Sequence, residues 1–206
     1  MKKILLKEVF KKSWASTKAN ILFLGTSTFV YFVLSDLLSF DGRRGQGSLF
    51  IFIAEVVVSI LFSIGMYRSG LMIHKKEKPT LDVYGANPQL FLTVLWLTIL
   101  SALFTILGFI LLIIPGFIVM ARISMASYIL FQKHGKITAF EAIKESWEMT
   151  SGHTLKILLY FLTIFFLILL SFITLGLALV IVTPFLYISG AEIYSLLKKE
   201  EHTHVE

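Results

Sequence analysis

Long apolar runs alternate with shorter polar connections along the whole chain. A bilayer's hydrocarbon is about 30 Å thick, and a helix needs about 20 apolar residues to cross it. The runs therefore predict an all-α fold, a polytopic membrane bundle of six transmembrane helices in one domain, at residues 18–40, 48–73, 88–112, 115–132, 154–174 and 177–198. Tight turns are expected at Asp41 to Gly47, at Ile113-Ile114-Pro115-Gly116 and at Leu175-Gly176, so that the helices pair as three hairpins.

Two further segments have apolar residues at helical spacing opposite a polar face. Such helices lie in the interface plane of a membrane, where tryptophan is a favoured anchor. We therefore predict interfacial helices at residues 3–16 and 137–150, anchored by Trp14 and Trp147. The apolar positions are Leu6, Val9, Phe10 and Trp14 in the first segment and Phe140, Ile143 and Trp147 in the second.

These two segments also resemble one another. Residues 11–17 and 144–150 align without gaps, and they share a lysine, a serine, a tryptophan and a threonine. One interpretation is an internal repeat of surface helix plus hairpin, present three times, with residues 80–84 as a degenerate middle copy. The other is that both segments simply use the residues that membrane-entry helices favour.

Composition and charge place the chain in a membrane and orient it. Of the 206 residues, 56% are hydrophobic and 16% charged, mean hydropathy is +0.82, and the net charge of +6 comes from lysines at the ends of apolar runs. Sixteen Lys and Arg fall on the side of the termini and long connectors, against Arg43 and Arg44 on the other. The positive-inside rule then predicts a multi-pass protein of the cell membrane with both termini cytoplasmic. That basic face would contact anionic lipid headgroups, and nucleic-acid binding is not expected.

Charged residues within the apolar runs need a partner or water, because an ionisable group in hydrocarbon is costly. Glu55 and Arg122 each lie seven residues from the predicted outer end of their helix, about 10 Å deep. Thr183 and Pro184 fall near the same level, where the proline frees a backbone carbonyl. We predict a Glu55–Arg122 pair beside this kink, serving either to lock the helices together or to bind an anion or proton.

Three other charged residues lie nearer the membrane surfaces. Asp36 is close to the outer end of its span, and Glu192 is in the inner third of the last span. Arg68, at the inner end of the second span, is a possible partner for Glu192, although both acidic residues could simply face the headgroups.

Nothing in the sequence predicts catalysis, a metal or a cofactor. The chain has no cysteine, and none of its five histidines forms the i, i+4 pair of a helical zinc site. Glu148, His153 and Lys156 are the only polar trio near one surface that a lipid enzyme could use.

Several motifs together resemble a group of uncharacterised bacterial six-span membrane proteins, similar to the membrane domain attached to some glycerophosphodiester phosphodiesterases. The motifs, spread over residues 60–198, are Met66-Tyr67-Arg68-Ser69-Gly70-Leu71, Glu77-Lys78-Pro79-Thr80, Ile114-Pro115-Gly116-Phe117, Ser124-Met125-Ala126, Ala142 to His153, Pro184-Phe185 and Ala191-Glu192-Ile193-Tyr194. The resemblance implies a bacterial inner-membrane protein of six helices, without a known catalytic site in the membrane part. The phosphodiesterase domain itself is absent, so its activity is not implied.

Three functions remain open at this stage. A non-enzymatic accessory, scaffold or lipid-interacting module is favoured, with membrane lipid, a membrane-protein partner or a second copy of the chain as its partner. The alternative is a small transporter or channel with a polar site around Glu55 and Arg122. A membrane-bound lipid enzyme comes third.

Overall fold

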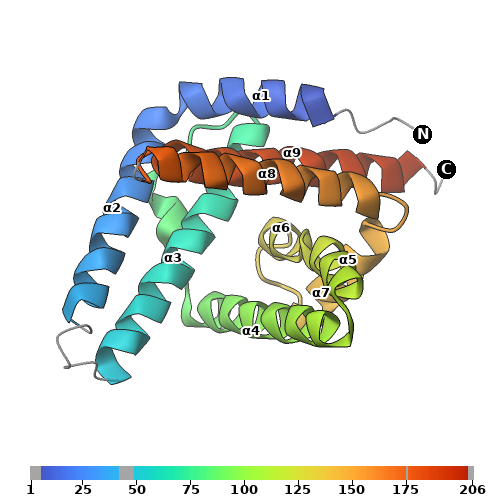
Figure 1. Cartoon of the computed structure of the whole chain (residues 1–206), viewed down its shortest axis with the longest axis horizontal. Coiled ribbons are helices and arrows are strands. Elements are labelled where there is room, and N and C mark those ends of the chain that lie inside the picture. Colours follow the sequence, from blue (N-terminus) through green and yellow to red (C-terminus); the bar gives the residue numbers. More distant parts are fainter. Residues whose placement is uncertain (1–5, 42–48, 175, 204–206) are drawn as a thin grey trace.

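The computed structural model describes residues 6–41, 49–174 and 176–203, and every regular element in these ranges is a helix (Figure 1). The predicted turn at Asp41 to Gly47 lies almost wholly outside the described residues. The helices are α1 Leu6–Ala19, α2 Ile21–Asp41, α3 Leu49–His74, the short 3₁₀ helix η2 Leu81–Tyr84, α4 Pro88–Leu111, α5 Ile113–Ile123, α6 Ala126–Gln132, α7 Ala139–Met149, α8 Thr154–Ile173 and α9 Leu179–Thr203.

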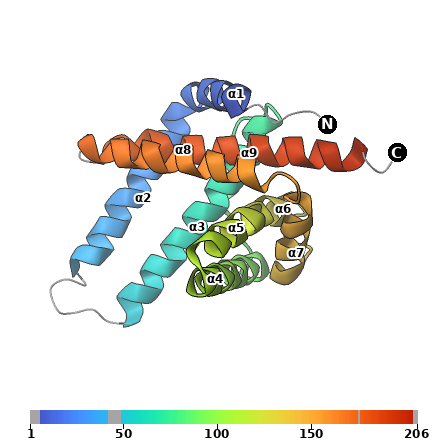
Figure 2. The same ribbon diagram turned by 45° about the vertical axis from the view of Figure 1, so that its right-hand side comes forward.

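The predicted all-α membrane fold is confirmed. By length and composition, six helical stretches of the described chain can cross a membrane: Ile21–Leu38, Leu49–His74, Pro88–Leu111, Ile113–Gln132, Thr154–Ile173 and Leu179–Glu200. The three hairpins do not run parallel to one another. In Figures 1 and 2, α2 and α3 slant away from α8 and α9. Helix α4 looks parallel to α8 in Figure 1, but it is strongly foreshortened in Figure 2 while α8 is not, so it follows a third direction.

The second helices of the three hairpins meet at the centre of the fold. Tyr67 of α3 packs edge-on against Tyr128 of α6, with ring centroids 4.9 Å apart, and against Tyr187 of α9 at 4.8 Å. The Tyr128 hydroxyl donates to the carbonyl of Tyr187 at 2.9 Å. Glycine makes this packing possible, because a Cβ on Gly70 would lie 2.9 Å from that same carbonyl oxygen and a Cβ on Gly190 would overlap the Tyr128 hydroxyl.

The helices that precede the hairpins pack in a cyclic order. η2 packs on α3, α7 packs on α6, and α1 packs on α9, so that each covers the second helix of another hairpin. Because α1 precedes the first hairpin and α9 ends the third, this last contact closes the cycle. Figure 1 shows α1 lying over α9.

The connections that follow the first and the second hairpin share one backbone geometry. Lys76 after α3 and His134 after α6 are the two non-glycine residues with positive φ in the described chain, at 65° and 54°. Each is followed by the same backbone hydrogen bond, from Glu77 to Met72 at 2.9 Å and from Gly135 to Leu130 at 3.0 Å, which is a Schellman helix end. The next helix then begins after Thr80 or Thr138 as the N-cap residue. These connections support a repeat for its second and third copies, although only Thr138 caps its helix with a side-chain hydrogen bond.

The turn of the second hairpin differs from the prediction. Leu112 alone, in an extended conformation, separates α4 from α5, and Pro115 and Gly116 belong to the first turn of α5. Proline is tolerated there because that turn has no partner for its amide. The two helices approach closely at two glycines, since a Cβ on Gly108 would lie 3.0 Å from the Gly116 Cα.

The predicted kink at Pro184 does not interrupt its helix. Helix α9 begins at Leu179 and continues through Pro184, which lies in its second turn. The fourth span is the one that is interrupted: α5 ends at Ile123, and α6 begins at Ala126 after a turn at Ser124 and Met125. A glycine or proline signal could not reveal this break, because neither residue is present there.

The two amphipathic helices dock on protein through faces that overlap the predicted ones in part, since Val9 and Phe10 of α1 and Ile143 of α7 pack inward as expected. α1 buries Val9, Ser13 and Thr17, and α7 buries Ala139, Ala142, Ile143, Ser146 and Met149. Phe140, expected on the apolar face, is 60% exposed, while the predicted anchors Trp14 and Trp147 are 44% and 42% exposed. The serine and threonine of the repeated motif thus face inward, and each tryptophan lies at the edge of the contact.

Candidate functional site

Helix α7 supplies hydrogen-bond partners at the break in the fourth span. Where a helix is interrupted inside a membrane, its free backbone groups must find other partners. The Ser146 hydroxyl supplies both kinds: it donates to the carbonyl of Arg122 at 2.7 Å and accepts from the amide of Met125 at 3.1 Å. The repeated serine motif of α7 therefore holds the broken helix in place.

The same pair of serine and threonine occurs in α1, but there it lies against an unbroken helix. Thr17 donates to the carbonyl of Ser13 at 2.8 Å, just as Thr150 donates to that of Ser146 at 2.7 Å. The Ser13 hydroxyl is buried, yet it has no hydrogen-bond partner among the described residues. α1 packs on α9, a helix without an interruption at this point, so Ser13 has no freed backbone groups to satisfy.

Arg122, the charge within the fourth span, contacts the C-terminal end of α7. Its Nη1 donates to the carbonyl of Trp147 at 3.1 Å, and the guanidinium carbon lies 5.5 Å from the centroid of the indole ring. A cation is favourable against the last carbonyls of a helix and over an aromatic face. The buried Nε nevertheless has no partner in the part of the chain that the structure describes.

The structure does not bring the four residues of the predicted polar site together. Arg122 is held by α7, and its described ion pairs and hydrogen bonds do not include Glu55 of α3. Thr183 and Pro184 lie on α9, which packs mainly on α1, α2, α3 and α8 and touches α7 at few residues. Counting residues from a turn gives equal depth only when helices run parallel, and these hairpins do not.

Glu192 has partners that the sequence did not indicate. Its buried carboxylate accepts from Lys12 Nζ of α1 at 2.7 Å and lies 2.9 Å from His74 Nδ1 at the end of α3. The predicted partner Arg68 instead donates to the carbonyls of Val83 and Gly85, so it holds η2 against α3. Glu192 therefore joins α1, α3 and α9.

The other predicted polar positions do not converge on one point. Asp36 lies on an exposed part of α2. His153 pairs with Glu200 at 2.9 Å, joining the start of α8 to the end of α9, while Glu148 is exposed on α7. The trio considered for a lipid enzyme thus forms no shared site in the described structure.

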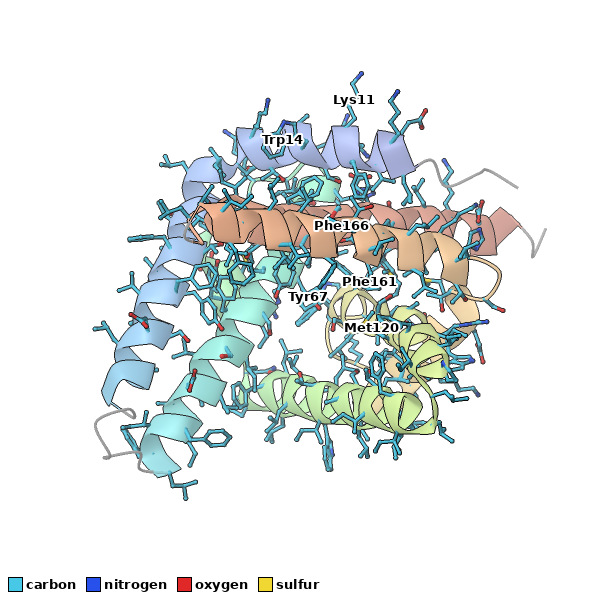
Figure 3. All side chains as sticks on the ribbon, in the orientation of Figure 1. Lys11, Trp14, Tyr67, Met120, Phe161 and Phe166 are labelled. Atoms are coloured by element: carbon cyan, nitrogen blue, oxygen red, sulfur yellow. The ribbon has the colours of Figure 1, made fainter. Side chains whose placement is uncertain are left out.

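Two cavities lie on either side of the broken span. The central cavity, about 500 Å³, is bordered by Tyr67, Met120 and Phe161, which lie near the middle of the molecule in Figure 3. Hydroxyl groups from four elements reach it, and no charged side chain lines it. They belong to Tyr67, Ser101, Thr105, Ser127, Tyr128 and Tyr160, and Ser124 in the turn between α5 and α6 adds another.

The second cavity is an apolar groove of about 410 Å³ between α4, α5 and α7. Leu107 and Val119 are among its walls, and Trp147 is shared between the groove and the Arg122 contact. Lys144 and Glu148, one turn apart on α7, are the charged residues that line it. We call it the α7 groove.

These features were only partly accessible from the sequence. The likeness between the two serine-tryptophan segments was visible, but not that Ser146 would complete a broken helix. Among the described residues no group of three His, Cys, Asp or Glu could hold a metal ion. No protein family, curated protein or solved structure matches the chain.

Proposed function

We propose that this membrane protein is a non-enzymatic module that binds lipid, with an acyl chain in the α7 groove. The observation that carries the proposal is the groove itself, which lies between two apolar helices and an amphipathic one. Its volume of about 410 Å³ is within the size of ligand sites, about 300–1,000 Å³.

The lining of the groove explains why a lipid would occupy it. The walls from α4 and α5 are apolar, and apolar cavities exclude water. In a bilayer, the apolar groups that can enter such a groove are the acyl chains of lipids. The amphipathic helix α7 supplies the remaining wall, with exposed Phe140 and half-exposed Trp147 of the kind that favour the headgroup boundary.

Filling the groove should displace the lipid. Leu107→Trp places a bulkier side chain in the groove. Because Leu107 is already 47% exposed, the fold should tolerate the change. Excluding two methylenes at about 0.8 kcal/mol each corresponds to about tenfold weaker binding. We therefore expect about tenfold less copurified lipid, measured by mass spectrometry of extracts from detergent-purified protein.

Leu103→Trp is the matched control. Leu103 lies one turn before Leu107 on the same helix, is 50% exposed and does not line the groove. Its variant should retain the lipid content of the unmodified protein. If both variants keep the lipid, or both lose it, the groove is not the binding site.

Transport of a small uncharged solute is the second candidate, and the central cavity favours it. The hydroxyl groups there can replace hydration, whereas the absence of a charged lining residue disfavours ions. This candidate predicts that proteoliposomes equilibrate glycerol faster than protein-free vesicles in stopped-flow light scattering. Thr105→Trp, inside the cavity, should abolish the gain, whereas Thr98→Trp, exposed on the same helix, should not.

A further inference from the structure

We infer that the guanidinium of Arg122 binds the phosphate of a phospholipid whose acyl chain lies in the α7 groove. This inference rests on the proposed function and adds the chemical class of the lipid.

Arg122 has donors that the protein does not use. A guanidinium carries five N–H groups. In the described structure one Nη1 bond goes to the Trp147 carbonyl, while Nε is buried without a partner and no carboxylate pairs with the side chain. A cation in an apolar span is costly until an anion compensates it. The half-exposed side chain therefore leaves an under-satisfied positive charge available to an anionic group.

Trp147 connects this charge to the groove. Its carbonyl accepts from Arg122, its ring lies against the guanidinium, and the same residue lines the α7 groove. A ligand with its chain in the groove would thus have its polar end within reach of Arg122. Phosphate fits this donor because an arginine can bond two of its oxygens at once.

Arg122 supplies the net charge beside the groove, because the two charged residues of α7 that line it have opposite signs. Lys144 and Glu148 both line the groove and offset one another. The groove lining therefore has no net charge, and Arg122, which contacts the lining residue Trp147, adds one positive charge beside it that suits the single negative charge of a phosphodiester.

The test compares two lipids with the same acyl chains, of which one carries a phosphodiester headgroup and the other a free hydroxyl. Delipidated protein in detergent is offered dioleoyl phosphatidylglycerol or dioleoylglycerol, and the bound amount of each is measured by native mass spectrometry. We expect the unmodified protein to prefer the phospholipid about tenfold, the size expected for one charge-assisted hydrogen-bonded contact. Arg122→Gln should bring the preference close to unity while dioleoylglycerol still binds.

Two further variants serve as controls for the Arg122→Gln result. Arg122→Lys keeps the positive charge but not the paired donors, so it should retain part of the preference, and it supplies the readout if Arg122→Gln does not fold. Lys156→Gln removes a cation from α8, outside the groove, and should leave the preference unchanged.

The outcomes separate this inference from the proposed function. An unchanged phospholipid preference in both Arg122 variants would overturn the inference, while loss of lipid in Leu107→Trp would still support the groove. Displacement of phosphatidylglycerol by inorganic phosphate at equal concentration would instead show a free-phosphate site and overturn the lipid assignment.

Discussion

Gly70→Ala is expected to destabilise the protein strongly, because α3 and α9 cross at this residue with backbone against backbone. The added Cβ would lie 2.9 Å from the Tyr187 carbonyl oxygen and 3.3 Å from its carbon. Neither atom belongs to a flexible side chain, so the helices must separate, and overpacking of this kind costs about 1–3 kcal/mol. The shift would also part the rings of Tyr67 and Tyr187. Unfolding in detergent, followed by circular dichroism, measures the loss.

Gly25→Ala is the matched control for this prediction. It also lies within an apolar helix, but the nearest atoms to its added Cβ would be ordinary contacts at 3.7 Å. Alanine is the better helix former by about 1 kcal/mol, so the stability should be unchanged or higher. Equal effects of the two substitutions would contradict the close crossing of α3 and α9.

Ser146→Ala should remove the support of the broken fourth span. It leaves the Met125 amide without its partner, at about 1–3 kcal/mol for a buried group, and removes one of the two hydroxyls that donate to the Arg122 carbonyl, the other being that of Thr150. The variant should unfold at a lower temperature, and hydrogen exchange should increase at the amides around Met125.

Ser13→Ala tests whether the loss of stability comes from the broken fourth span and not from the serine motif itself. Ser13 holds the equivalent position in α1 and is equally buried, at 0% exposure for both serines. Because its hydroxyl has no described partner, removing it should have little effect or raise the stability. A large loss in Ser13→Ala, with little change in Ser146→Ala, would reverse the roles assigned to the two serines.

The sequence predicted the six spans because their signal is local. A run of about 20 apolar residues is sufficient to identify a membrane helix, and the helices α4 and α8 begin at the expected residues, Pro88 and Thr154. Turn details were less accessible. Proline and glycine at 115 and 116 were read as the turn itself, whereas the structure uses them in the first turn of α5, where both are tolerated and the glycine allows close packing.

The polar contacts could not be predicted, because they depend on which helices become neighbours. Glu192 was compared with Arg68 by depth alone, but α1 docks on α9 and brings Lys12 to the carboxylate. Arg122 was compared with Glu55 in the same way, yet α7 lies against the broken span and takes the guanidinium. The repeated serine motif was the one sequence signal that led to the site, although its function became clear only from the backbone groups around Ser146.

The docking of α1 on α9 has a consequence for biogenesis. α1 leaves the ribosome well before α9 has been translated, so its inward face, including Val9 and Thr17, stays without its partner throughout the insertion of the intervening helices. Lys12 meets Glu192 only after the third hairpin has entered the bilayer. A nascent chain that stalls before α9 would therefore expose the face of α1 that α9 covers in the folded protein.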